Sequence, residues 1–148
     1  MFIEKKIESL NKSYEEIKVG DKASISKVIC DEDVVSFSKI SGDVNPIHLD
    51  EEFAKKSLFK KRIAHGILTS SLISAVLGTK LPGINTLYLS QTLKFLAPVF
   101  LGDKLTAVVE VISKNDDKRI ITLKTSVFNE ENVEVVTGEA VVKKLRED

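Results

Sequence analysis

Gly66-Ile-Leu-Thr-Ser-Ser-Leu-Ile-Ser-Ala-Val-Leu77 is the stretch that decides the fold of this chain. It is apolar or small on nearly every side, and such all-round apolarity predicts a helix that is buried on most of its surface. Gly78 follows it as a predicted C-terminal cap, and Pro82-Gly83 as a predicted turn. We therefore expect one long helix, over about residues 66–77, inside the protein.

Strand-like segments follow this helix in close succession. The first, Thr86 to Leu96, alternates apolar with polar side chains, as a half-buried strand does. Consecutive strands with short turns form an antiparallel sheet, and one buried helix can lie across it. The remaining predicted strands and the turn-forming segments between them are 105–113, 119–128 and 133–143, with turns at 115–117 and 129–132.

The segments before the helix complete the predicted order of elements. Alternation predicts a strand from Lys22 to Cys30. Asp31 resembles an N-cap and starts a helix that ends at Gly42. Pro46 disfavours helical backbone at Asn45, so a non-helical turn is expected there, and a short helix covers about 51–57. The result is an α+β fold with an antiparallel sheet wrapped around a long central helix.

Composition limits the class of protein. A chain of 148 residues fits one domain, here residues 14–148 after a charged lead-in of residues 1–13. Its 22 Lys and Arg balance 22 Asp and Glu, which argues against nucleic acid as a partner. Its one cysteine, Cys30, excludes an internal disulfide and is expected to be a buried, inert thiol. No apolar run approaches the ~20 residues that span a membrane, and no signal peptide is evident. We expect a soluble, cytoplasmic protein without a membrane partner.

Phe37-Ser-Lys-Ile-Ser-Gly-Asp-Val-Asn-Pro-Ile-His-Leu-Asp50 carries the chemistry. It places Asp43, Asn45 and His48 on one constrained turn. By composition alone this could be an ordinary surface loop closed by an Asx-turn. Apolar neighbours of His48 favour a loop folded onto the core instead. A carboxylate and an imidazole held this close can bind and polarise one water, so we expect Asp43 and His48 to transfer protons.

His65-Gly66 is the second functional signal, at the predicted start of the long helix. N–H groups in a first helical turn lack internal partners and lie at the positive end of the helix dipole. Glycine lets a carbonyl oxygen approach such an N–H, which is the arrangement of an oxyanion hole. Tight packing of the helix would require the same glycine, and spacing does not separate the two interpretations. For His65 we favour a structural role at the helix start over a catalytic one.

Other kinds of site find less support. Two histidines with Asp43 and Asp50 match no zinc or iron spacing, so no metal is expected. The serines of the long helix lack a Gly-x-Ser-x-Gly elbow, and nucleotide-binding glycine motifs are missing. The basic run between Lys55 and Arg62 is typical of a solvated face, although beside an active site it could attract a phosphate-bearing substrate.

Together these motifs resemble the MaoC-like family of (R)-specific enoyl-CoA hydratases. Asp-x-Asn-Pro-x-His followed by His-Gly is specific for that family, although its dehydratase members share it. The resemblance covers about residues 18–145 and rests on Phe37 to His48, Phe53-Ala54, Ile63-Ala-His-Gly66, Leu81-Pro-Gly83, Tyr88-Leu-Ser-Gln-Thr-Leu-Lys-Phe95, Pro98-Val-Phe-Leu-Gly-Asp103 and Val136-Thr-Gly-Glu-Ala140.

The resemblance implies a hot-dog fold and a homodimer or dimer of dimers, with an acyl-CoA tunnel near the interface. By position, Asp43 and His48 become the catalytic pair, with Asp43 favoured as base and His48 as proton donor. Gly66 N–H binds the thioester oxygen. Asn45, Ser74 and His65 support the site, and the acyl pocket is expected to involve Leu72, Val76 and Leu77.

The activity implied is that of a hydro-lyase of fatty acid metabolism, which adds water reversibly to trans-2-enoyl-CoA and gives (R)-3-hydroxyacyl-CoA. No metal or redox cofactor is required, because hydration transfers no electrons. A (3R)-hydroxyacyl-carrier-protein dehydratase is the nearest alternative. A thioesterase is a weaker one, and a non-catalytic acyl-CoA-binding protein belongs to another class.

Overall fold

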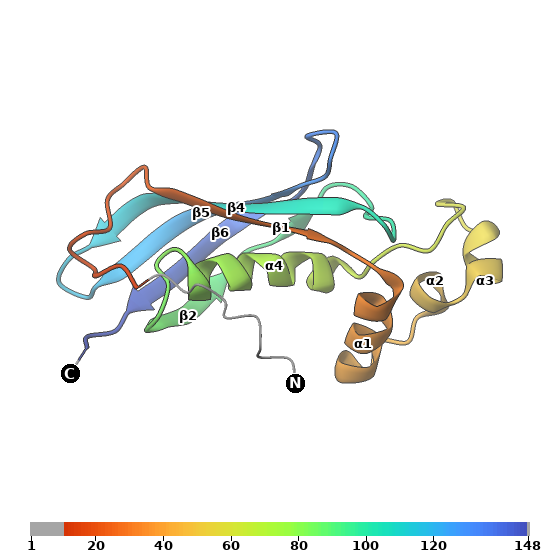
Figure 1. The fold of residues 1–148 in the computed structure, drawn as a ribbon, viewed down its shortest axis with the longest axis horizontal. Helices are drawn as coiled ribbons and strands as arrows, with labels where there is room; N and C mark the ends of the chain where they lie inside the picture. The colour runs from red at the N-terminus through yellow and green to blue at the C-terminus, as the bar shows by residue number, and fades with distance from the viewer. Residues whose placement is uncertain (1–10, 148) are drawn as a thin grey trace.

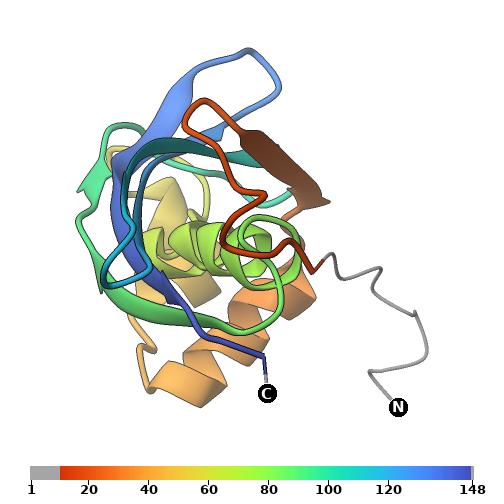
Figure 2. The ribbon, with the colours of Figure 1, turned by 90° about the vertical axis from the view of Figure 1, so that its left-hand side faces the viewer.

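The computed structural model describes residues 11–147 and consists of one curved antiparallel sheet around a central helix (Figures 1 and 2). The strands run in the order β1-β4-β5-β6-β2, and the short β3 pairs with β6. All pairings are antiparallel, as the short turns predict. The strands are β1 (Lys22–Val28), β2 (Thr86–Gln91), β3 (Lys94–Phe95), β4 (Lys104–Asn115), β5 (Ile120–Phe128) and β6 (Glu134–Lys144). This is the hot-dog architecture, so the predicted fold class is confirmed.

The central helix is α4 (Gly66–Thr79), and it begins at the predicted residue. It lies in the concave side of the sheet, which curls around it (Figure 2). The predicted cap at Gly78 is wrong. The helix continues to Thr79, whose hydroxyl donates to the Ala75 carbonyl, and Lys80 is the C-cap. Gly78 is exposed and has open space around it, so a helical backbone there meets no obstacle.

Three shorter helices lie beyond one end of the sheet (Figure 1). They are α1 (Asp31–Ser41), α2 (Pro46–Leu49) and α3 (Glu51–Lys55). The predicted helix α1 and its end at Gly42 are confirmed, but its N-cap is Cys30 and not the predicted Asp31. The sequence pattern did not predict α2, which is a single turn. Pro46 bars helical backbone only from the preceding residue and is itself well suited to a first helical position. None of the helices in residues 11–147 is long and apolar enough to cross a membrane.

The predicted strand from Thr86 to Leu96 is in fact two strands, β2 and β3. The chain bends between them where Thr92 crosses close over Gly138 of β6. A Cβ at Gly138 would lie 1.8 Å from the Thr92 carbonyl oxygen, and Thr92 N–H donates to the Glu139 carbonyl at 2.9 Å. The bend therefore depends on a glycine in a different strand, which the alternation within 86–96 does not reveal.

Residues 11–21 pack against the end of the sheet that lies opposite α1, α2 and α3 (Figure 1). Tyr14 and Ile17 are buried, and the Tyr14 hydroxyl donates to Asp116 at 2.6 Å. Burial and the Asp116 carboxylate raise the pKa of Tyr14 to about 12. Residues 11–13, assigned to the lead-in from sequence, thus adjoin the fold, since Asn11 forms a β-bridge with Gly83. The rest of that lead-in, residues 1–10, lies outside the described residues.

The prediction of a buried thiol is wrong, because Cys30 is exposed. It is the N-cap of α1, where its thiol donates to the Asp33 carboxylate at 3.2 Å. Helix N-caps lie at the ends of elements, and here that end faces solvent.

Lys144 is the largest fully buried side chain of the described residues, and replacing it is expected to destabilise the protein. Its ammonium donates to the Asn11 side chain and to the carbonyls of Pro82 and Ile84. Lys144→Met would leave those acceptors unpaired, a loss of about 1–3 kcal/mol in the free energy of unfolding. Urea unfolding measures it, with Lys143→Met as the adjacent control. Equal midpoints for the two variants would contradict this role.

Candidate active site

The loop after α1 is built from consecutive caps. Gly42 ends α1 in the left-handed region at φ 78°, where its N–H donates to the Ser38 carbonyl at 2.9 Å. The Asp43 carboxylate accepts from Asn45 N–H at 3.2 Å, and the Asn45 side chain accepts from Ile47 N–H at 3.2 Å as the N-cap of α2. Asn45 therefore orients the loop, as predicted, and α2 presents His48.

His48 is buried with a defined ring orientation. Its Nδ1 lies 2.7 Å from the Ile63 carbonyl oxygen. A carbonyl only accepts, so Nδ1 carries a hydrogen and donates it. Nε2 is then the group that can exchange a proton with substrate. Because this bond persists whether or not Nε2 is protonated, it holds the ring in one orientation through a catalytic cycle.

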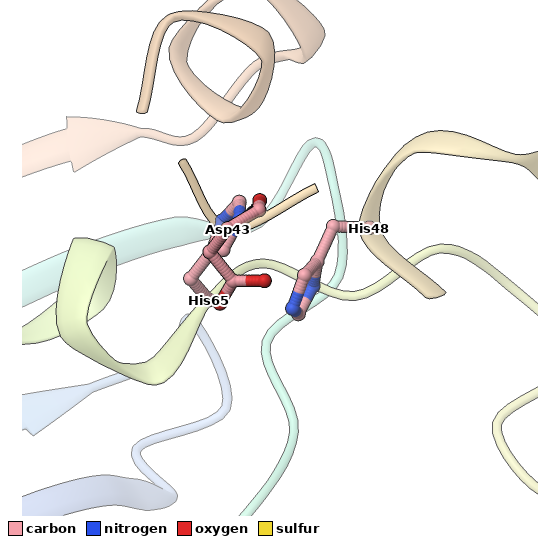
Figure 3. Close-up of side chains that lie close together, drawn as sticks. All are labelled: Asp43, His48 and His65. Carbon is pink, nitrogen blue, oxygen red and sulfur yellow. Dashed lines mark hydrogen bonds between the residues drawn. The ribbon is translucent and has the colours of Figure 1, made fainter. Parts of the chain in front are cut away.

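Asp43, His48 and His65 converge at one point (Figure 3). One carboxylate or ring-nitrogen atom from each lies within 4.8 Å of the others. Two groups that each hydrogen-bond the same water at about 2.8 Å, at a tetrahedral angle, lie about as far apart as these side-chain atoms do. The Asp43 carboxylate is exposed whereas both rings are buried. The predicted pair is thus brought together at a separation that one water could bridge, with Asp43 open to solvent.

His65 links three segments around this pair. It is the N-cap of α4, and its Nε2 lies 3.2 Å from the Asp43 carbonyl oxygen and 3.1 Å from the Ser38 hydroxyl. Its ring stacks on His48 at 3.8 Å between centroids and contacts Phe37 at 4.7 Å. These contacts agree with the structural role favoured from sequence. Because Nε2 donates to the carbonyl, the buried Nδ1 bears no hydrogen, and it has no partner within residues 11–147.

Burial lowers the pKa of His65 below its ordinary value of 6.5, and the adjacent His48 adds to this. At pH values below 6.5, the His65 side chain is therefore protonated in the unfolded chain, whereas its burial opposes protonation in the folded protein. Stability should fall as pH decreases through about 6.5 and on toward the folded pKa. We expect the free energy of unfolding to decrease less between pH 7.5 and 5 in His65→Gln than in the parent. Urea unfolding at several pH values measures the difference, and identical slopes would contradict it.

The same three side chains could be considered for a metal site, since their donor atoms are close together. The stacked rings argue against one. Ring lone pairs lie in the ring planes, and the planes of His48 and His65 differ by only 29°. Tetrahedral ligation requires donors that converge on the ion at roughly 110°. The donor set therefore fits a water better than a zinc ion, and the absence of a metal stays a prediction from sequence.

Gly66 begins α4 beside an apolar groove of about 440 Å³. Its N–H has no intrahelical partner. A Cβ on Gly66 would lie 2.6 Å from the Phe95 ring, so a side chain here would displace Phe95. Ile63, whose carbonyl holds His48, also lines the groove, which therefore borders the proton-transfer pair. Its other lining residues are Phe59, Ala64, Ile67, Thr69, Phe95, Leu96, Ala97, Pro98, Val99, Val135 and Val136.

Four predicted positions lie elsewhere. Ser74 is exposed two turns along α4, lines a different groove with Tyr88, and forms no side-chain hydrogen bond with the pair within residues 11–147, so its supporting role stays a prediction. Ser38 is the serine that contacts the site. The three side chains expected in the acyl pocket face the sheet and form part of the hydrophobic core: Leu72, Val76 and Leu77. Apolar side chains of a central helix point to the concave sheet, which explains this difference.

Sequence reasoning also missed the group that holds the His48 backbone. Arg62 Nε donates to the His48 carbonyl at 2.7 Å, and its guanidinium pairs with Asp31 at 2.7 Å. In the sequence, Arg62 is only the last member of a basic run that begins at Lys55. Its proximity to a predicted catalytic loop was the available signal, but the carbonyl contact required the tertiary structure.

Comparison with known proteins agrees with this geometry. Residues 13–133 match the model of the MaoC like domain. The (R)-specific enoyl-CoA hydratase of Aeromonas caviae is 47% identical over 131 residues, 88% of this chain and 98% of that protein. The 3-hydroxybutyryl-CoA dehydratase of Methylorubrum extorquens is 47% identical, over 88% and 82% of the two chains. The R-hydratase structure from Pseudomonas aeruginosa superimposes with a TM-score of 0.89 at 45% identity, over 93% and 88%. This chain is therefore a member of the MaoC-like family, as its motifs indicated.

Proposed function

We propose that this protein is an (R)-specific enoyl-CoA hydratase, which adds water reversibly to trans-2-enoyl-CoA. The observation that carries the proposal is the convergence of Asp43 and His48 within 4.8 Å, next to a glycine that begins the central helix. An apolar groove adjoins them, and it suits an acyl chain. The similarity to curated hydratases over most of both chains supports the same activity.

The mechanism assigns one task to each group. Gly66 N–H donates to the thioester oxygen and stabilises the enolate-like charge that develops there. Asp43 removes a proton from the bound water as its oxygen bonds to C3 and the C2–C3 π bond breaks. His48, protonated at Nε2, delivers a proton to C2 on the same face. A proton then passes from Asp43 to His48 and restores the starting state. No electron is transferred, and no cofactor takes part.

A second enzyme activity is dehydration of a carrier-protein thioester by the same residues. Loss of the conjugated enoyl absorbance of crotonyl-CoA, and an (R)-configured product, are expected of the hydratase. Side-by-side rates on CoA and carrier-protein thioesters separate the two activities. Release of free thiol would indicate a thioesterase, and binding without turnover a non-catalytic acyl-CoA protein. Faster turnover of the carrier-protein thioester, release of free thiol, or binding without turnover would each contradict the proposed function.

We also infer a homodimer that joins the β2 edges of two sheets. Within residues 11–147, β2 pairs with β6 on one side and has no strand on the other, and its apolar residues Leu87, Tyr88 and Leu89 are all exposed. An unpaired apolar edge is a template for a second strand, and a two-fold axis gives each copy the same partner surface. Light scattering should give twice the chain mass, and Leu87→Glu/Leu89→Lys should give the monomer. A monomeric parent protein would contradict the inference.

Cytoplasmic location remains a prediction from sequence.

A further inference from the structure

The loop between α3 and α4 carries two different surfaces. Phe59 and Ile63 line the apolar groove beside Gly66. Lys60, Lys61 and Arg62, which lie between them in sequence, line a separate hollow of about 260 Å³, together with Glu51, Lys55, Phe100 and Leu101. An apolar groove and a basic hollow therefore flank one short loop, next to the proton-transfer pair.

The basic hollow is defined by its lining, which has four cationic side chains and one carboxylate. Two of the cations already have partners, since Lys55 pairs with Glu52 and Arg62 with Asp31. Lys60 and Lys61 form no ion pair with any of residues 11–147. The Lys61 ammonium lies 5.8 Å from the centroid of the Phe100 ring, so an aromatic face adjoins the free charges. The hollow thus offers two uncommitted ammonium groups to an anion.

We propose that the basic hollow binds the phosphates at the nucleotide end of coenzyme A, through Lys60 and Lys61. This inference rests on the proposed function and deepens it. The acyl chain and pantetheine arm of the substrate are uncharged and match the apolar groove. Its negative charge is confined to phosphates, and lysine binds phosphate as a point charge. The substrate therefore has the same division into apolar and charged parts as the two sides of the loop.

The shape of the hollow favours a nucleotide over an acidic carrier protein. A concave space of about 260 Å³ accommodates phosphate groups, whereas a protein partner typically covers about 800 Å² of a broader surface. Phosphates also attract cations in proportion to their number, so affinity should fall stepwise when they are removed from the ligand. That stepwise loss distinguishes the 3′-phosphate from the diphosphate as the source of binding.

The test compares three crotonyl thioesters: those of CoA, of dephospho-CoA and of pantetheine. For the parent protein, KM should rise in that order with little change in kcat. Lys60→Gln/Lys61→Gln should raise KM for crotonyl-CoA about tenfold and should leave the three KM values nearly equal. The control is Lys18→Gln/Lys118→Gln, which removes the same charge from two exposed lysines in segments at the other end of the sheet (Figure 1). It should keep the order seen in the parent.

Three results would overturn the inference. The parent could turn over crotonyl-CoA and crotonyl-pantetheine with equal KM, which would leave the hydratase function intact and remove the phosphate site. The control could lose as much as the Lys60/Lys61 variant, which would indicate a general effect of net charge. With a crotonyl carrier-protein thioester measured alongside, Lys60→Gln/Lys61→Gln could raise KM for that substrate alone, which would assign the hollow to a protein. Absence of turnover for all three thioesters would instead contradict the proposed function.

Discussion

Asp43→Asn is expected to lower kcat/KM for crotonyl-CoA by about a thousandfold. General acid–base catalysis contributes about 10²–10⁴-fold, and asparagine cannot take a proton from water. The amide keeps the side-chain oxygen that accepts from Asn45 N–H, so the loop should retain its conformation. Initial rates of loss of the enoyl absorbance measure the effect, and substrate binding should change little by comparison.

Asp50→Asn is the matched control for this prediction. Asp50 lies seven residues further on and caps α3 by accepting from Phe53 N–H at 3.0 Å. Asparagine is an equally good N-cap, so stability and activity should both persist. Full activity in an Asp43→Asn/His48→Gln double variant would refute the assignment of the pair. A similar loss in Asp50→Asn would show that the loop tolerates no change of charge at all.

Gly66→Ala is expected to lower kcat by about a hundredfold while the protein remains folded. The new Cβ would lie 2.6 Å from the Phe95 ring. Either the ring or the start of α4 must then move, and misplacing one oxyanion donor costs about 10²–10³-fold in kcat. Single-turnover kinetics separate this loss in the chemical step from a loss of binding.

A double-mutant cycle with Phe95→Ala identifies the reason for this loss. If Gly66 serves mainly to accommodate Phe95, then Gly66→Ala should cost little once the ring is removed. If the thioester itself needs the space, then the cost should remain. Gly78→Ala is the control in the same helix, because its Cβ would meet nothing within 4 Å. It should leave activity unchanged and stabilise the protein by up to about 1 kcal/mol. A Gly66→Ala variant with parental kcat would contradict the oxyanion role.

Local sequence patterns predicted the elements that depend on local chemistry. The apolar run at Gly66–Thr79 is helical, and the alternating segments after it are strands. The predictions failed where a distant residue decides the outcome. Gly138 allows the crossing at Thr92 that splits one predicted strand into two, and Lys144 contacts Asn11, which lies 133 residues earlier in the chain.

The same distinction between local and distant contacts applies to the candidate active site. The positions of Asp43, Asn45 and His48 could be predicted because the three residues lie on one turn, which local hydrogen bonds of the Asp43 and Asn45 side chains hold in place. The partners that orient them could not be predicted in this way. Ser38 meets His65 across 27 residues, and the Ile63 carbonyl meets His48 across 15.

The sequence by itself therefore determined the long apolar helix, the antiparallel order of strands and the family, and it placed the candidate pair Asp43 and His48 and the glycine Gly66. Periodicity, capping and short motifs act over a few residues, so one chain is enough to express them. Only the tertiary structure decided that His65 stacks on His48, that Phe95 covers Gly66, and that Ser74 and the expected pocket residues lie elsewhere. Those contacts join segments far apart in sequence, and they form only when the sheet closes around α4 and presses its first turn against the loop after α1.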